Sequence, residues 1–310
     1  MYIEKKALAI MATYNGENFI REAIESIPKK CDLLISDDGS TDGTLKYLNS
    51  IENRHVSILN YSSGGKPALN FGNAINNTPS NYNYYFLADQ DDIWTNEKYR
   101  LLIGEIEKIE KQYGEECPIL LFGDSIIVDS TLKVINESFF EYDGLDANIL
   151  INKRNVFFQN IAQGATMIFN KALLERCRPM PKEIYMHDWW LLLCALNFGE
   201  VRVSKYKTLL YRQHENNNIG ANKRNLIKQL FSQIAKKSKI KNHLKKINQQ
   251  TECFANIYRS QLHCDKTIKF LTDFFCISHS KNTLCRKFFL FKNRIYLSSL
   301  KRTIVLYLYF

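Results

Sequence analysis

The chain has 310 residues, a formal net charge of +10, 45% hydrophobic residues and 24% charged residues. These values indicate a folded, soluble protein with a substantial core. No apolar run reaches the roughly 18 to 20 residues of a spanning helix. The apolar run near the N-terminus is too short for a signal peptide, so we expect a cytoplasmic location.

Strand-like and helix-like patterns alternate along the first part of the chain. Apolar runs typical of strands begin near residues 7, 31, 55 and 82, and residues 17–27, 44–51, 67–77 and 96–112 have helical spacing. Such alternation predicts βαβ units and a parallel sheet with helices on both faces. Residues 118–129, 160–175, 187–200 and 201–217 continue with further strand-like and helical runs.

Charge divides the chain near Gly220. Residues 221–310 contain 19 Lys and Arg against 3 Asp and Glu, which leaves a net charge of −6 on residues 1–220. We therefore expect two domains, 1–220 and a basic, helical 221–310. The stretch KFFLFKNRIYLSSLKRTIVLYLYF mixes aromatic and basic residues and recognisable nucleic-acid motifs are absent, which favours an anionic membrane surface over nucleic acid. The alternative is a tail packed on its own domain with a solvated basic face.

The cysteines do not indicate a metal or disulfide framework. Eight are scattered along the chain without a CxxC pair, so buried thiols in a reducing compartment are the simplest interpretation. A zinc site at His263, Cys264, Cys276 and His279 is disfavoured because the spacing matches no common site.

Polar motifs follow four of the predicted strands. They are TYNGE, SDDGSTDG, SSGGK and DQDD. Because ligands bind beyond the carboxyl ends of parallel strands, we expect these motifs to meet in one crevice.

The motif DQDD places three carboxylates, Asp89, Asp91 and Asp92, within four positions. Their mutual repulsion is relieved by a bound cation, and few hard oxygen ligands suit Mg²⁺ or Mn²⁺ completed by substrate phosphates. The alternative is a solvated acidic turn that caps the next helix.

The motif SDDGSTDG permits three interpretations. Its spacing resembles the start of a calcium loop, but the twelfth position is Asn49 rather than Glu, which disfavours calcium. Asp37 or Asp38 is a candidate acceptor for a nucleotide base N–H, and the same side chains are also good helix caps. SSGGK is not a P-loop, although Lys66 is a candidate phosphate contact.

Six motifs in order resemble the family 2 glycosyltransferases, especially the bacterial rhamnosyltransferase-like enzymes of surface-polysaccharide synthesis. They are TYNGENFIREAIESI, SDDGSTDGT, FLADQDDIW, QGATMIFN, HDWW and YRQHENNNIG, and together they span roughly residues 5–220. The resemblance implies a GT-A (Rossmann-like) α/β fold with a mostly parallel sheet, a nucleotide-diphosphate sugar donor, a divalent metal and inversion at the anomeric carbon.

The resemblance also implies roles for individual residues. Asp188 corresponds to the general base, preceded by His187 where most relatives have an acid. His214 resembles a histidine that helps hold the metal or diphosphate in some GT-A enzymes, and the alternative is an ordinary loop histidine. The implied sets are Thr13, Tyr14, Asn15, Glu17, Asp37, Asp38 and Asp89 for the donor, Asp91 and His214 for the metal, and Gln163, Gly164, Trp189 and Trp190 for the acceptor.

The expected reaction transfers a sugar, with rhamnose from dTDP-rhamnose as the first hypothesis, to a hydroxyl of a lipid-linked oligosaccharide or glycan. This acceptor would place the enzyme on the inner face of the cytoplasmic membrane. Alternatives are transfer of galactose, glucose or an N-acetylhexosamine from UDP, a sugar nucleotidyltransferase, and a non-catalytic sugar- or membrane-binding module. Trp189 and Trp190 begin an apolar helix, where a core position competes with sugar stacking.

Overall fold

The computed structural model describes residues 5–52, 55–214 and 232–310, with side chains from residue 237 in the last range. It divides into two compact units. The sheet unit comprises Met1–Tyr142, Ala162–Lys182 and Met186–Asn218, and the helical unit comprises Asp143–Ile161, Glu183–Tyr185 and Ile219–Phe310. The boundary expected near residue 220 lies outside the described residues.

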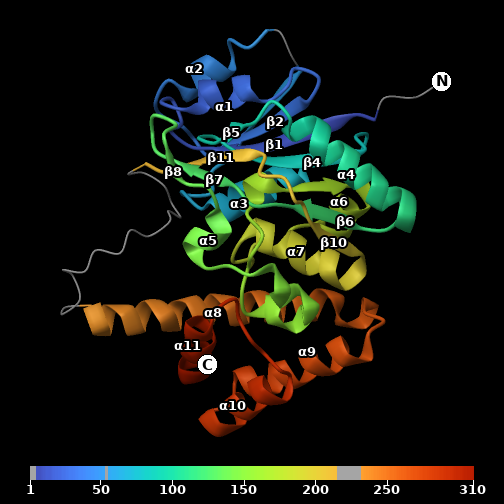
Figure 1. The fold of residues 1–310 in the computed structure, drawn as a ribbon, viewed down its shortest axis with the longest axis vertical. Coiled ribbons are helices and arrows are strands. Elements are labelled where there is room, and N and C mark those ends of the chain that lie inside the picture. The colour runs from blue at the N-terminus through green and yellow to red at the C-terminus, as the bar shows by residue number, and fades with distance from the viewer. Residues whose placement is uncertain (1–4, 53–54, 215–231) are drawn as a thin grey trace. The chain divides into compact units, whose positions relative to one another are not determined.

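The sheet unit is built on a seven-stranded, mostly parallel sheet (Figure 1). In spatial order its strands are β10 (Glu200–Val203), β6 (Ile119–Phe122), β9 (Ile168–Asn170), β4 (Tyr84–Asp89), β1 (Ala7–Thr13), β2 (Asp32–Asp37) and β3 (Val56–Asn60). Only β9 runs antiparallel to its neighbours within this sheet. The expected parallel arrangement of the first four strands is confirmed.

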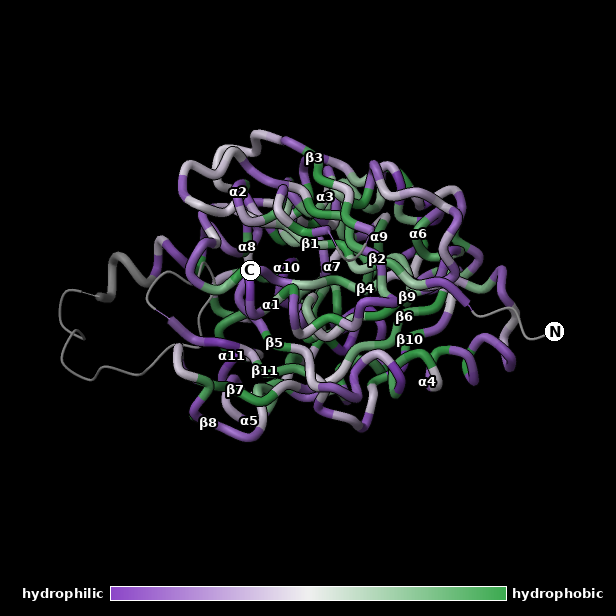
Figure 2. Tube along the Cα trace, turned by 90° about the horizontal axis from the view of Figure 1, so that it is seen from above, coloured by the Kyte–Doolittle hydropathy of each residue, from purple (hydrophilic) through white to green (hydrophobic). Residues whose placement is uncertain are grey.

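Continuous apolar runs explain why these strands pair in the interior. Every residue of β6 is buried, as are five of the six residues of β4. Strands covered on both faces carry such runs instead of alternating polar residues. Figure 2 accordingly shows hydrophobic residues gathered along the middle strands of the sheet.

Helices flank the sheet. They are α1 (Ile20–Ser26), α2 (Thr44–Leu48), α3 (Pro67–Asn76), α4 (Lys98–Tyr113), α6 (Lys171–Cys177) and α7 (His187–Phe198), with the short α5 (Phe139–Asp143) farther along the chain from α4. Proline at the first position of α3 fits a helix start, where its missing N–H is not needed. Helix α7 is buried from His187 to Leu196, so it lies in the core of the unit.

A second, four-stranded sheet brings a late segment of the chain beside the acidic turn. Its order is β5 (Ile93–Trp94), β11 (Leu209–Arg212), β7 (Ile126–Val128) and β8 (Val134–Asn136). Strand β11 pairs antiparallel with β5, which directly follows DQDD. Residues 212–214 are thereby fixed next to residues 89–92.

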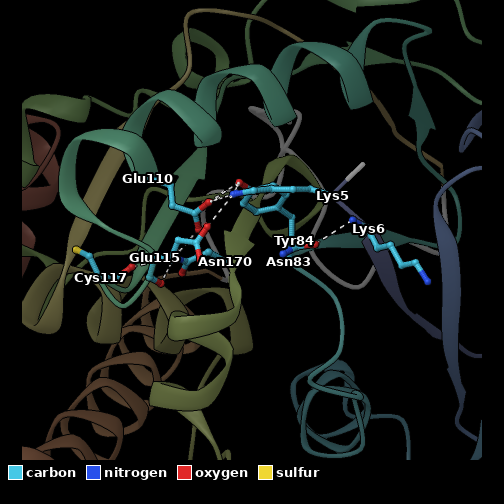
Figure 3. Close-up of polar contacts among 8 residues, drawn as sticks. All are labelled: Lys5, Lys6, Asn83, Tyr84, Glu110, Glu115, Cys117 and Asn170. Carbon is cyan, nitrogen blue, oxygen red and sulfur yellow. Dashed lines mark hydrogen bonds and ion pairs between the residues drawn. The ribbon is translucent and has the colours of Figure 1, made fainter. Parts of the chain in front are cut away.

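A cluster of polar side chains lies at the start of β4, at the end of this strand that is opposite to the acidic turn (Figure 3). The carboxylate of Glu110 accepts hydrogen bonds from Lys5 Nζ at 2.5 Å and from Tyr84 Oη at 2.6 Å. Asn170 contributes through its side chain, which donates to the carbonyl of Cys117 at 2.8 Å. Tyr84 begins β4 and Asp89 ends it, so this cluster is separate from the polar strand ends.

The helical unit contains four helices, α8 (Ser232–Tyr258), α9 (Asp265–Ser278), α10 (Thr283–Lys292) and α11 (Leu300–Tyr309), within its described residues. Short 3₁₀ turns accompany them: η1 (Ala147–Ile151), η2 (Lys153–Phe157) and η5 (Arg259–Gln261). Phe157 and Phe158 pack against phenylalanines of the long helices, with Phe158 and Phe310 ring centroids 5.3 Å apart. Over the described ranges, each helix is too short or too polar to cross a bilayer.

Candidate active site

The carboxyl ends of the central parallel strands lie side by side, as the sequence predicts. In the sheet register Thr13 is opposite Asp37, and Ala12 is opposite Asp89. Helix α3 reinforces this edge, because the side chain of Asn70 donates to the carbonyl oxygens of Thr13 at 3.2 Å and Ser36 at 2.9 Å. The polar motifs after β1, β2 and β4 therefore share one edge of the sheet.

The turn after β1 is held by Gln90. Its Oε1 accepts hydrogen bonds from Thr13 Oγ1 at 2.6 Å and from the Tyr14 backbone N–H at 2.9 Å, and its Nε2 donates to the Tyr14 carbonyl at 3.1 Å. A Cβ at Gly16 would lie 2.5 Å from Gln90 Oε1, so a larger residue there would displace the Gln90 amide from these hydrogen bonds. The Tyr14 side chain remains 48% exposed, so its ring is available to a ligand at this edge of the sheet.

The loop after β2 is tied to the same turn. Asn15 Oδ1 accepts from the Thr41 N–H at 2.8 Å, and Glu17 accepts from the Gly43 N–H at 3.0 Å. Asp37 accepts from the backbone N–H of Ser40 at 2.8 Å. These three predicted donor-site residues therefore shape the loop between β2 and α2, and their contact with a nucleotide remains a prediction. Helix α2 begins after its N-cap residue Gly43, which has no side-chain cap, so the alternative in which Asp37 caps this helix is not what the structure shows.

Asp38 organises the glycine-containing loop. It accepts hydrogen bonds from the backbone N–H and hydroxyl of Ser63 and, at 2.9 Å, from the N–H of Gly65. Gly64 and Gly65 have φ values of +70° and +75°, which favour glycine. Lys66 follows this loop as an exposed residue at the start of α3, so its side chain is available to a phosphate.

The acidic turn after β4 has strongly perturbed carboxyl groups. Burial and the nearby Asp91 and Asp188 raise the pKa of Asp89 to about 7, while Lys98 opposes the rise. Burial, Asp91 and Asp89 raise the pKa of Asp92 well above its usual range. Asp92 is 2% exposed, and its Oδ2 has no hydrogen-bond partner among the described residues. Electrostatic strain of this kind is typical of functional sites.

Arg212 supports the acidic turn from β11. Its backbone N–H donates to Asp92 Oδ1 at 3.0 Å, and its Nε donates to the Asp91 carbonyl at 2.9 Å. Its Nη1 reaches the Ser130 carbonyl at 2.8 Å, and its Nη2 reaches Glu22 at 2.6 Å. The side chain is only 2% exposed, so Arg212 fixes the backbone of the turn.

His214 lies beside Asp91. Its Nε2 is 2.8 Å from Asp91 Oδ2, and its ring centroid lies 4.7 Å from that of Phe19. The 2.8 Å separation is a hydrogen-bond distance between the imidazole and the carboxylate. Both are ligand types that divalent cations accept, so Asp91 and His214 are the residues that would hold Mg²⁺ or Mn²⁺. In the described part of the chain no cluster of three or more His, Cys, Asp or Glu forms a metal site, so further ligands would come from water and phosphate.

Lys98 is a buried cation that the sequence did not single out. Its side chain is fully buried, with Nζ 2.5 Å from the Ala165 carbonyl oxygen and 4.2 Å from the Trp94 ring centroid. Burial lowers the pKa of Lys98 to about 7, and Asp92 and Asp89 oppose the fall. The sequence offers one clue to this buried lysine: it lies in the first turn of α4, where the helix dipole disfavours a cation.

The candidate acceptor side is formed by the loop before β9 and the start of α7. Gln163 precedes the 3₁₀ turn η3 (Gly164–Thr166), and its Oε1 accepts from Ser125 Oγ at 2.7 Å. A Cβ at Gly164 would lie 3.4 Å from the Cβ of Asp188, so the loop packs directly against the predicted base. Gln163 Nε2 is buried without a hydrogen-bond partner among the described residues.

The first turn of α7 holds Asp188 between the acidic turn and that loop. Asp188 is 5% exposed, and it is close enough to Asp89 to raise the pKa of Asp89. His187 stacks on Phe71 with ring centroids 3.8 Å apart, and burial lowers the pKa of His187 to about 3. Trp189 and Trp190 are almost fully buried, which is what the core alternative predicts and leaves little ring surface for stacking on a sugar.

A mostly parallel sheet whose strand ends combine an acidic turn, a glycine loop and an exposed tyrosine is a GT-A-like fold. The family model for glycosyl transferase family 2 matches residues 8–113. The chain is 31% identical over 229 residues to the dTDP-rhamnosyl transferase RfbG of Shigella flexneri, covering 68% of this chain and 74% of that protein. The chain therefore belongs to family 2 of the glycosyltransferases.

Solved structures agree on the fold. The crystal structure of S. aureus TarS matches 88% of this chain and 43% of its own length, with 16% sequence identity and a TM-score of 0.57. A crystal structure of S. aureus TarS 1–349 in complex with UDP-GlcNAc matches 97% of this chain and 79% of its own length, with 17% identity and a TM-score of 0.55.

Proposed function

We propose that this glycosyltransferase moves rhamnose from dTDP-rhamnose to a hydroxyl group, with inversion at the anomeric carbon and with the help of Mg²⁺ or Mn²⁺. The choice of donor rests on the relative named a dTDP-rhamnosyl transferase, with which the chain shares 31% identity. A UDP-hexose is the second candidate, because the TarS fold holds UDP-GlcNAc.

The observation that carries the proposal is the shared edge of the sheet. The exposed Tyr14 follows β1, and Asp38, which orders the glycine loop, follows β2. Asp89 and Asp91 lie at the end of β4, which pairs with β1 on its other side. We propose that the nucleotide lies over the first two motifs and directs its diphosphate toward Asp91 and His214. When bound there, a divalent cation neutralises the charge that develops on the departing diphosphate.

Asp188 is the proposed general base. As the acceptor oxygen forms its bond to the anomeric carbon, the bond from that carbon to the diphosphate oxygen breaks, and Asp188 takes the proton of the acceptor hydroxyl. Its first-turn position on α7, beside Gly164 and within electrostatic reach of Asp89, supports this role. Gln163 Nε2, a buried donor with no partner among the described residues, is the proposed contact for a hydroxyl of the acceptor.

The test is a panel of sugar nucleotides screened for metal-dependent release of nucleoside diphosphate, with dTDP-rhamnose and UDP-GlcNAc included. In D188N we expect kcat to fall by about 10³-fold, with the affinity for nucleoside diphosphate nearly unchanged. E116Q, at an exposed glutamate of the same unit, is the control and should turn over normally. Equal loss of donor affinity and turnover in D188N would contradict the assignment of the base.

We further propose that the helical unit binds an anionic membrane surface and that the acceptor is a lipid-linked oligosaccharide or glycan at the inner face of the cytoplasmic membrane. On α10 and α11, six apolar side chains are between 49% and 76% exposed. They are Leu284, Phe288 and Phe291 on α10 and Leu300, Ile304 and Leu308 on α11. Each set repeats at helical spacing, which defines one apolar stripe per helix.

Charge supports a lipid partner for these stripes. Residues 281–310 contain seven Lys and Arg and no Asp or Glu. Exposed apolar stripes bordered by cations are the pattern of helices that lie in the interface of an anionic bilayer.

Flotation of the full-length protein with vesicles that contain phosphatidylglycerol tests this proposal. The F288S/F291S variant should bind about tenfold more weakly, because the loss of two rings from the bilayer interface removes about 1.4 kcal/mol or more of apolar transfer energy. The control is I151S, which removes an 85% exposed apolar side chain of the same unit outside the stripes. Equal binding by wild type and F288S/F291S would exclude this surface.

A further inference from the structure

Lys98 occupies a position that local helix chemistry does not explain. It is the first residue of α4, where the positive end of the helix dipole repels a cation, yet its side chain is fully buried. A buried lysine is retained only if its hydrogen bonds and charge partners repay the loss of water. The partners of Lys98 therefore indicate what it does.

The first partner is a backbone carbonyl in the acceptor-side loop. Lys98 Nζ donates to Ala165 O at 2.5 Å, and Ala165 is only 1% exposed. Within the turn, Thr166 donates to the Gln163 carbonyl through its N–H at 3.0 Å and its hydroxyl at 2.7 Å, and Met167 N–H donates to the Gly164 carbonyl at 2.8 Å. The segment after β6 also holds the turn, through Gly123 N–H to Thr166 Oγ1 at 3.2 Å and Ser125 Oγ to Gln163 Oε1 at 2.7 Å. Lys98 adds a separate anchor, from the start of α4.

The second partner is Trp94, whose ring centroid lies 4.2 Å from Lys98 Nζ. The carboxylates of Asp92 and Asp89 are near enough to favour the charged form of Lys98. Trp94 belongs to β5, the strand that follows the acidic turn and pairs with β11. One side chain therefore contacts the loop next to Asp188 and lies in the field of the carboxylates on the donor side.

We infer that Lys98 is a positioning residue for the transfer reaction. It ties the acceptor-side loop 163–166, and with it Gly164, against which Asp188 packs, to Trp94 of β5, the strand that directly follows the donor-side acidic turn 89–92. This inference rests on the proposed function, because it assigns donor and acceptor to the two sides that Lys98 joins. The link is a hydrogen bond to a backbone carbonyl, so a methionine of similar length cannot replace it.

The experiment compares K98M with K30M in the full-length protein. Lys30 is a matched control, since its Nζ also lies over an aromatic ring, Tyr99, at 4.4 Å, but its side chain is exposed. Hydrogen exchange followed by mass spectrometry reports on the amides of 163–167. We expect at least about tenfold faster exchange there in K98M, with α3 amides unchanged and K30M equal to wild type.

Kinetics provide the second measurement. With the sugar nucleotide that wild type turns over, kcat of K98M should fall about 30-fold, while the affinity for nucleoside diphosphate with Mn²⁺ stays within about threefold. Unchanged exchange at 163–167, or an equal loss of kcat and nucleotide affinity, would overturn the inference. If wild type releases no diphosphate from any sugar nucleotide, the proposed function fails, and the exchange measurement still decides whether Lys98 orders the loop.

A second variant covers the case in which K98M does not fold. K98M/D92N also neutralises Asp92, the carboxylate that acts most strongly on the Lys98 charge and whose Oδ2 has no hydrogen-bond partner among the described residues. The amide oxygen of the D92N side chain keeps an acceptor for the Arg212 N–H. We expect this variant to fold and to show the same fast exchange at 163–167. Wild-type protection and turnover in K98M/D92N would show that Lys98 only balances charge.

Discussion

His187 should make the sheet unit sensitive to acid. It is 9% exposed and stacked on Phe71, and burial lowers its pKa from an ordinary 6.5 to about 3. Between these two values the unfolded chain binds a proton that the folded chain excludes, so stability falls as the pH falls. The loss is about 2 kcal/mol between pH 7.5 and pH 5, and it approaches about 5 kcal/mol below pH 3.

Substitution of His187 by glutamine isolates this effect. H187Q should be less stable than wild type at pH 7.5, because the ring contact with Phe71 is lost. Its further loss between pH 7.5 and pH 5 should be about 2 kcal/mol smaller than that of wild type. Asp89, whose pKa is raised, gives the opposite trend, but it is present in both proteins and cancels in the comparison.

Urea unfolding followed by tryptophan fluorescence measures this difference. All three tryptophans, Trp94, Trp189 and Trp190, belong to the sheet unit, so the signal reports on the unit that contains His187. H55Q replaces an exposed histidine of the same unit and is the matched control. If H187Q loses as much stability on acidification as wild type and H55Q, the buried imidazole is not the acid-sensitive group.

Three further outcomes are expected. R212M, which removes a 2% exposed guanidinium, should lower the free energy of unfolding by about 3 to 5 kcal/mol, whereas R100M at an exposed ion pair should change it by less than about 0.5 kcal/mol in the same urea titrations. E110Q should lower the free energy of unfolding by about 1 to 2 kcal/mol, because the partly exposed Lys5 loses its charged partner. It should leave kcat unchanged, and a fall in kcat would connect this cluster with the site. H214A should raise the Mn²⁺ concentration for half-maximal turnover at least about tenfold after removal of metal by EDTA, and an unchanged value would exclude His214 as a ligand.

The central sheet could be predicted because β1, β2 and β4 are apolar runs that end in polar turns. Their parallel order follows from the alternation with helices. The reversal of β9 could not be predicted, since its three residues carry too little periodicity to distinguish strand directions. The small sheet around β11 could not be predicted for the same reason, because its strands are short. This sheet brings His214 to Asp91.

The candidate site likewise contains residues that the sequence predicted and residues that it did not. Asp89, Asp91 and Asp37 were found because acids at strand ends indicate a binding edge even without coordinates. Lys98 and Arg212 were missed because they bind backbone carbonyls, those of Ala165, Asp91 and Ser130. A carbonyl is present at every residue, so no letter of the sequence marks which one a buried cation will reach.

The phenylalanine packing of the helical unit limits how the chain can be shortened. Phe157 and Phe158 come from the stretch 143–161, and their neighbours Phe254, Phe270 and Phe274 come from beyond residue 231. A protein cut near residue 220 would keep the first two rings without their cover, and the released fragment would lack the rings that fill its own interior. A truncated or chimaeric protein should therefore keep residues 143–310 together, including the segments 162–182 and 186–218 that belong to the sheet unit.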